Sequence, residues 1–235
     1  MIRAISAHLG PRGDRRLTWP TRRLRLMPLV FALVACAGCD WMYYGTMRKF
    51  GLEKRDILVK RVRAARGAQQ EAKEEFRSAL EKFQTVLDVD GGSLEDKYNE
   101  LNDVLERSES RARRVRDRIK AVRDVSADLF REWEKELRQY SDRTLRAQSE
   151  RELDETRRRA DALIAAMSRA EERIDPVLSP LRDRVLFLKH NLNAQAVGAL
   201  TKELTSMRGN VDALVADLER AIAEADLFIE AMETE

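Results

Sequence analysis

Apolar residues recur at alternating intervals of three and four along most of the chain, and this spacing constrains the fold more than any other feature. Such positions lie on one face of an α-helix, and a sustained repeat predicts helices packed side by side in a left-handed, coiled-coil-like way. We call each row of these positions a seam. The seams extend over 58–86, 94–133, 149–177 and 197–232. Polar residues interrupt them at Gln69, Ser108, Ser126, Ser149 and Thr156. Seams this long need neighbouring helices to cover them.

The segments between the seams carry residues that end and start helices. The glycine pair at 91–92 tolerates positive φ, and Ser93 can cap the helix that follows. Asp142 offers a second cap, and Pro176 and Pro180 should start or kink a helix because proline lacks an N–H group. We therefore expect helices at about 53–88, 94–140, 143–192 and 195–233.

Short connections make sequential helices antiparallel. Residues 53–235 are thus predicted to form an all-α fold, an elongated antiparallel coiled-coil-like bundle of three to four long helices. A bend is expected near Asn191-Leu192-Asn193. The third and fourth helices could also be nearly continuous, which would give three arms in place of four.

The charge balance argues against a nucleic-acid partner. The whole chain has a formal net charge of +3, and a basic protein invites that reading. However, residues 1–38 hold seven arginines and one acidic residue, so the remainder carries 37 basic and 40 acidic side chains. A charge-mixed body of this kind is typical of a solvated helical surface.

Residues 1–38 have the organisation of a secretory signal peptide. An arginine-rich stretch ends at Arg25, and an apolar run follows over 26–37. The run is shorter than the roughly twenty residues that span a bilayer as a helix, and small residues follow it. The pattern predicts export, so that everything after the leader faces the periplasm. An uncleaved anchor is the alternative.

The stretch Leu33-Val34-Ala35-Cys36-Ala37-Gly38-Cys39 looks like a lipobox, the site at which a bacterial lipoprotein receives diacylglycerol on a cysteine thiol. Two registers are open. Residues 33–36 match the usual pattern throughout and would place the lipid on Cys36. Residues 36–39 have the common Ala-Gly-Cys ending, with a cysteine where leucine is usual, and would place the lipid on Cys39. A disulfide framework is less expected, because these are the only two cysteines and they lie three residues apart.

The lipid position also bears on which membrane holds the protein. Asp40 directly follows Cys39, and in the enterobacterial sorting rule an aspartate there retains a lipoprotein in the inner membrane. If Cys36 is modified instead, Ala37 follows it and the outer membrane is favoured. We expect the inner membrane, with the outer membrane as the alternative.

Residues 39–52 are expected to lie beside the membrane. Trp41, Tyr43 and Tyr44 carry amphipathic rings that suit the membrane–water interface. The alternative is that these rings pack on the base of the bundle.

The residues that enzymes and metal sites need are scarce after residue 39. That part of the chain has no cysteine and one histidine, His190, which lacks the Glu-x-x-His spacing of di-metal bundles. The chain contains no Gly-Lys pair and therefore no phosphate-binding P-loop. We expect no catalytic, cofactor or metal site. The competing hypothesis is an enzyme or metal-binding bundle built from carboxylates and His190.

The chain resembles a family of bacterial lipoproteins defined by the domain of unknown function 2959. The stretches that carry the resemblance are Tyr43-Tyr44, residues 51–59 (Gly-Leu-Glu-Lys-Arg-Asp-Ile-Leu-Val), Asp90-Gly91-Gly92, residues 130–134 (Phe-Arg-Glu-Trp-Glu) with Glu136-Leu137, and residues 188–194 (Leu-Lys-His-Asn-Leu-Asn-Ala). Members place the lipidated cysteine a few residues before the paired tyrosines, so the resemblance favours Cys39. It implies no activity, cofactor or partner.

Together these features predict a non-enzymatic envelope lipoprotein that acts as a structural or protein-interaction rod in the periplasm. It would be held to a membrane by its N-terminal lipid, and it would bind an envelope protein or a second copy of itself.

Overall fold

The computed structural model describes the backbone of residues 27–88, 93–191 and 204–234 and the side chains of 54–87, 93–191 and 206–234. The chain divides into two compact units, Met1–Arg48 and Lys49–Glu235. The described part of the first unit is the beginning of one helix, and the second unit contains the bundle.

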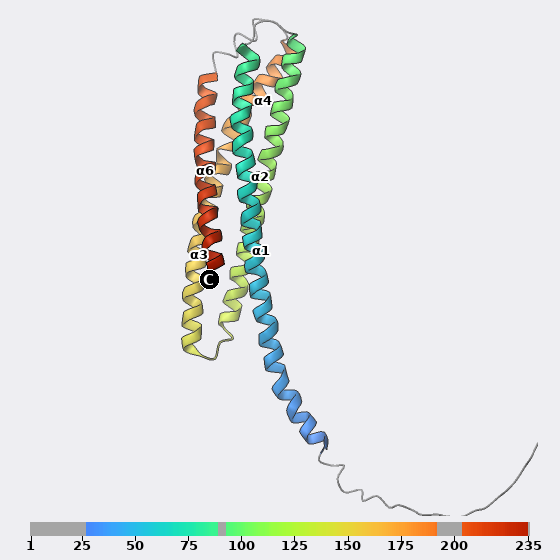
Figure 1. Cartoon of the computed structure of the whole chain (residues 1–235), viewed down its shortest axis with the longest axis vertical. Coiled ribbons are helices and arrows are strands. Elements are labelled where there is room, and N and C mark those ends of the chain that lie inside the picture. The colour runs from blue at the N-terminus through green and yellow to red at the C-terminus, as the bar shows by residue number, and fades with distance from the viewer. Residues whose placement is uncertain (1–26, 89–92, 192–203, 235) are drawn as a thin grey trace, which may run out of the picture. The chain divides into compact units, whose positions relative to one another are not determined.

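Every described element is an α-helix (Figure 1), which confirms the predicted all-α class. The helices are α1 (Met27–Asp88), α2 (Leu94–Leu137), α3 (Arg143–Glu172), α4 (Ile174–His190) and α6 (Leu204–Thr234). At 1.5 Å per residue, the 44 residues of α2 extend about 66 Å. Within the described residues, no helix contains a run long and apolar enough to cross a membrane.

Ion pairs between helices fix the antiparallel order within the second unit. Along α1 and α2, Lys54 pairs with Glu132, and Lys82 near the other end of α1 pairs with Glu100. Partners on α2 therefore move backward as those on α1 move forward. The same relation holds between α1 and α6, where the pairs are Arg63–Glu233 and Arg77–Glu219, and between α2 and α4, where they are Arg116–Asp175 and Glu109–Arg182. The bundle is antiparallel, as predicted.

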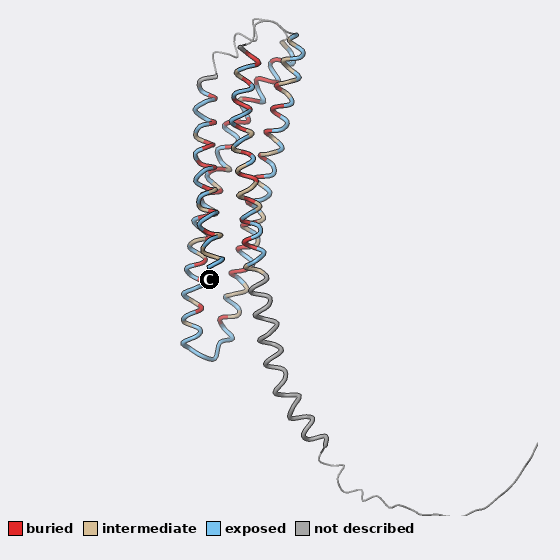
Figure 2. The backbone as a smooth tube through the Cα atoms, viewed as in Figure 1, coloured by how far each residue is buried: buried red, intermediate tan, exposed pale blue. Residues whose placement is uncertain are grey.

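The core lies along the seams, with buried positions recurring on the inward side of each helix (Figure 2). Of the large side chains on the predicted seams, Phe76, Phe83, Leu129, Leu163 and Leu214 are buried, which confirms the heptad register. Trp133 is half-buried, and the side chain of Leu204 lies outside the described residues.

The two predicted caps are confirmed. The hydroxyl of Ser93 accepts hydrogen bonds from the backbone N–H groups of Glu95 and Asp96 at the start of α2. The carboxylate of Asp142 accepts from those of Thr144 (2.7 Å) and Leu145 (3.2 Å) at the start of α3. Each cap satisfies N–H groups that have no partner inside the helix.

The prediction of one helix over 143–192 is wrong, because α3 ends at Glu172 and α4 begins at Ile174. Pro176 has no N–H to donate to the carbonyl of Glu172, four residues earlier, so the helix is interrupted there. Pro180 lies inside α4 and frees the carbonyl of Pro176 in the same way. The side-chain amide of Asn210 on α6 donates to that carbonyl at 3.3 Å, so this hydrogen bond joins α4 to α6.

The predicted start of the first helix at residue 53 is also wrong, since α1 begins at Met27. Pro28 occupies the first turn, where an N–H group would have no partner inside the helix, and no other proline lies between Met27 and Asp88. The bend near Asn191-Leu192-Asn193 and the start of a helix at 195 concern residues 192–203, which lie outside the described residues. The predicted end of the second helix at 140 is close to its observed end at Leu137.

The five polar seam residues are all buried, as the register requires, and Gln69 is the least compatible with its surroundings. Its side chain is fully buried, and neither amide atom has a hydrogen-bond partner among the described residues. An unsatisfied buried polar group costs about 1–3 kcal/mol. Gln69 therefore lowers the free energy of unfolding of the bundle.

Gln69→Met is expected to raise the free energy of unfolding by about 1–3 kcal/mol, because the thioether has similar length and needs no hydrogen bond. Urea denaturation followed by circular dichroism measures the change. The control is Gln70→Met, since the amide of Gln70 is only half-buried and donates to Glu74 at 2.7 Å. A Gln69→Met protein no more stable than the wild type would show that the buried amide is satisfied.

Candidate functional site

The predicted lipid-attachment residues, Cys39 and its alternative Cys36, both fall within the first part of α1. Their side chains lie outside the described residues. Lipid attachment at either thiol therefore stays a prediction from the sequence.

Two of the stretches that carry the family resemblance meet in the second unit, although 70 residues, 60–129, separate them. The first, at the start of the second unit, contributes Lys54 and Arg55 from α1. The second, near the end of α2, contributes Glu132, Trp133 and Glu136. We call these five residues the 55/133 cluster. The antiparallel pairing of α1 and α2 brings them together.

The centre of the 55/133 cluster is a cation–π contact. The guanidinium carbon of Arg55 lies 5.2 Å from the centroid of the Trp133 ring, within the range of such contacts. On the other side, the indole N–H of Trp133 donates to the hydroxyl of Ser149 on α3 at 2.9 Å. Trp133 therefore links α1, α2 and α3 at one end of the bundle, which explains why a large aromatic residue occupies a half-buried seam position.

Two neighbouring carboxylates lie on the acidic side of the cluster, and their charges affect each other. Glu132 and Glu136 are four residues apart and so lie on one helix face, and Lys54 forms an ion pair with Glu132. Burial raises the pKa of the Glu136 carboxyl above its ordinary value of 4.5, the negative charge of Glu132 raises it further, and the positive charge of Lys54 opposes both effects.

The hollow beside these residues is small. It measures about 80 Å³ and is lined by Arg55, Leu129, Glu132, Trp133 and Glu136. That space holds a few water molecules but not a metabolite-sized ligand, for which pockets are typically several hundred Å³. The arrangement is suited to holding three helices together.

Glu136→Gln is expected to stabilise the bundle at neutral pH and to have little effect below about pH 4, near the ordinary glutamate pKa. A carboxyl whose folded-state pKa is raised favours folding when protonated, and that contribution is lost as the pH rises through the folded-state pKa. Glutamine is uncharged, like the protonated carboxyl, so the variant retains this favourable contribution to folding at every pH.

Thermal unfolding of Glu136→Gln and wild-type protein at pH 3.5 and pH 7 tests this expectation. The matched control is Glu81→Gln, whose exposed side chain has no ion pair with a described residue. A gain that is the same at both pH values would contradict the electrostatic explanation.

A second polar cluster, which we call the Asp217 cluster, surrounds the break between α3 and α4. Asp217 on α6 is 6% exposed and accepts hydrogen bonds from Arg173 (3.2 Å) and Arg220. An open hollow of about 460 Å³ lies over it, with Arg169, Glu172 and Pro176 completing the lining. Two guanidinium groups thus lie against the buried carboxylate.

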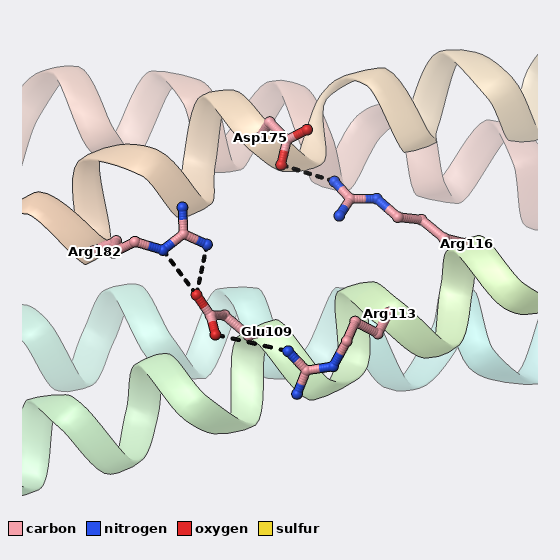
Figure 3. Close-up of polar contacts among 5 residues, drawn as sticks. All are labelled: Glu109, Arg113, Arg116, Asp175 and Arg182. Carbon is pink, nitrogen blue, oxygen red and sulfur yellow. Dashed lines mark hydrogen bonds and ion pairs between the residues drawn. The ribbon is translucent and has the colours of Figure 1, made fainter.

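The opposite side of the same break is tied to α2 by charged contacts, shown in Figure 3. Arg116 on α2 donates to Asp175 on α4 at 2.8 Å. Glu109 accepts two hydrogen bonds from Arg182, at 2.9 and 2.6 Å, and its other oxygen lies 3.7 Å from Arg113. Exposed ion pairs contribute less than about 1 kcal/mol each. Their value here is in fixing the register of α4 against α2.

His190, the residue on which an enzyme or metal-binding reading would depend, is exposed at the end of α4. In the part of the chain that the structure describes, no three histidine, cysteine, aspartate or glutamate side chains gather as they would around a metal ion.

The sequence interpretation did not identify the 55/133 cluster or the Asp217 cluster. Trp133 ends the predicted seam over 94–133, and both stretches carry the family resemblance, yet neither feature indicates that the two stretches meet. The available signal was the antiparallel pairing itself, which aligns the start of one helix with the end of the next. Asp217 gave no comparable signal, because a single acidic residue beside the seam of α6 looks like a solvated one.

The fold and these clusters define an all-α antiparallel helical-bundle protein whose helices are joined by ion pairs. A family model described as "Protein of unknown function (DUF2959)" matches residues 43–232. The match covers most of the chain, and the chain belongs to this family, as its resemblance-carrying stretches predicted. The match includes the whole 55/133 cluster and begins after the two cysteines. No curated protein matches the chain.

Proposed function

We propose that the chain is a lipid-anchored protein of the bacterial cell envelope whose helical bundle binds an envelope protein or a second copy of itself. The observation that carries the proposal is the order of its parts. A lipobox-like stretch at 33–39 precedes the bundle, and the bundle has a continuous core of its own in the second unit.

The bundle surface supports an interaction role. Ion pairs join α1 to α2, α1 to α6 and α2 to α4, so the polar surface is built mainly from matched charges. Two neighbouring large apolar residues on α4 depart from this pattern: Leu186 is 53% exposed and Phe187 is 42% exposed. Exposed apolar residues that lie together are typical of contact surfaces.

Photocrosslinking in intact cells tests the interaction role. A benzophenone amino acid replaces Phe187 in one variant and the exposed Arg118 in another, each in the full chain. A discrete crosslinked species at position 187, identified as an envelope protein or as a dimer of this chain, and absent at position 118, is the expected result. If neither position gives a discrete product, the interaction role of this surface is wrong.

A further inference from the structure

The turn between α2 and α3 lies at the end of the second unit where α1 enters it. Lys54 near that entrance pairs with Glu132, and Glu134 two residues later pairs with Arg157 on α3 at 2.7 Å. The chain continues from these contacts to the end of α2 at Leu137 and returns in α3 from Arg143. We call residues 138–146 the hairpin tip.

The hairpin tip exposes apolar side chains that no described element covers. All nine of its residues are exposed, including Tyr140 (43%) and Leu145 (53%). A turn between two helices needs neither residue for its own geometry, because the cap of Asp142 supplies its hydrogen bonds. An aromatic ring with a polar end beside an aliphatic side chain suits the boundary between lipid headgroups and acyl chains.

The hairpin tip is also positively charged. It contains Arg138, Arg143 and Arg146 and one acid, Asp142, whose Oδ1 accepts hydrogen bonds from two backbone N–H groups. Arg146 donates to Glu150 at 2.9 Å. Neither Arg138 nor Arg143 has an ion pair with any residue that the structure describes, so two guanidinium groups are available to an anionic surface.

We propose that the hairpin tip docks on the anionic phospholipid surface that holds the protein's own lipid. The proposal rests on the proposed function, because it needs the lipid on the N-terminal side of the bundle. Tyr140 and Leu145 would enter the headgroup region, and Arg138 and Arg143 would bind lipid phosphates. The bundle would then contact the membrane at two points, the lipid and the hairpin tip.

The length of chain between the lipid and the bundle permits this contact. Lys54 is the fifteenth residue after Cys39, so this end of the second unit stays within about 50 Å of the lipidated residue even if the segment is fully extended. The other end of α2 lies about 66 Å further along the bundle. The charge and apolar character of the hairpin tip therefore occur at the end that the tether holds near the membrane.

A spin-label measurement on the full, lipidated chain in vesicles tests the proposal. Leu145→Cys carries a nitroxide in one sample, and Leu227→Cys, at another exposed leucine, on α6, carries it in the control. Accessibility to lipid-soluble oxygen and to a water-soluble nickel chelate reports whether each label enters the bilayer. Unsubstituted protein treated with the same label reveals any signal from a native cysteine.

The expected result is that the label at 145 becomes protected from the nickel chelate in vesicles containing phosphatidylglycerol, whereas the label at 227 stays in water. Flotation with the vesicles separates the two hypotheses. A chain that does not float would contradict the lipid anchor, and a chain that floats while position 145 stays in water would overturn the hairpin proposal alone. Protection that needs a high protein-to-lipid ratio would also overturn it, because it would indicate contact with a second copy.

The charge contribution is tested separately with Arg138→Gln/Arg143→Gln. Each arginine near an anionic surface contributes roughly fivefold in binding, so the double variant should lower the ratio of inserted to water-exposed label about twenty-five-fold. Arg118→Gln/Arg208→Gln removes two exposed arginines elsewhere and should leave the ratio unchanged. Equal losses in both variants would show that only net charge matters and would contradict docking by the tip.

Discussion

Cys39→Ser is expected to move the protein almost entirely from the membrane fraction to the soluble fraction of the cell envelope. The lipid on this thiol would supply the main attachment, since each buried methylene contributes about 0.8 kcal/mol and several acyl chains make the anchoring effectively permanent. The leader that stays uncleaved in this variant offers an apolar run of only residues 26–37, interrupted by Pro28, which is shorter than a membrane-spanning helix.

Fractionation of cells expressing wild type, Cys39→Ser and Cys36→Ser, with a carbonate wash of the membranes, measures this effect. Cys36→Ser is the matched control, because it changes the same residue type three positions earlier and should leave the protein on the membrane. If Cys36→Ser releases the protein and Cys39→Ser does not, the lipid is on Cys36. If neither releases it, the protein is held by an uncleaved leader or by other contacts.

Phe76→Ala is expected to lower the free energy of unfolding by about 3–5 kcal/mol. The Phe76 side chain is fully buried in the core of the second unit, and alanine would leave a cavity that the surrounding helices cannot fill. Such a loss is a large part of the total stability of a typical domain, which is about 5–15 kcal/mol. The change is measured by urea denaturation followed by circular dichroism.

Leu227→Ala provides the control for this experiment. Leu227 is 61% exposed on α6, so its truncation should change the free energy of unfolding by less than about 0.5 kcal/mol. Losses of similar size in the two variants would mean that the heptad register has been assigned to the wrong helix faces. A second core variant, Leu163→Ala, should behave like Phe76→Ala, because Leu163 is 1% exposed.

The buried seams and the helix caps could be predicted from the sequence because they depend on local spacing. An apolar residue at every third or fourth position determines which face of a helix must be covered, whatever covers it. Phe76, Phe83 and Leu163 lie on the predicted seams and are buried for that reason. Ser93 and Asp142 were likewise identifiable as caps, since a cap acts on backbone groups two or three residues away.

The break between α3 and α4 was only partly predictable. Pro176 and Pro180 indicated a start or a kink, but not which of the two would interrupt the helix. The helix continues through Pro180, and the carbonyl of Pro176 that Pro180 leaves without a helical partner accepts a hydrogen bond from Asn210 on α6. A partner thirty-four residues away cannot be found from local spacing.

The 55/133 cluster depends on contacts between segments far apart in the chain. Arg55, Trp133 and Ser149 belong to three different helices, and their contact follows from the antiparallel pairing of α1 with α2 and of α2 with α3. A seam indicates that Trp133 faces inward but not that an arginine covers its ring. The exposure of the hairpin tip, in contrast, follows from its place between two helices. Only the structure shows at which end of the bundle the hairpin tip lies.

Mass spectrometry of the mature amino terminus tests the proposed anchoring most directly. The protein is extracted from membranes with detergent and digested, and the first peptide is sequenced. The expected first residue is Cys39 carrying diacylglycerol, with Asp40 as the second residue and no peptide from residues 1–38. A mature chain that begins elsewhere, or that retains an unmodified Cys39 together with leader residues, would contradict the lipid-anchored account.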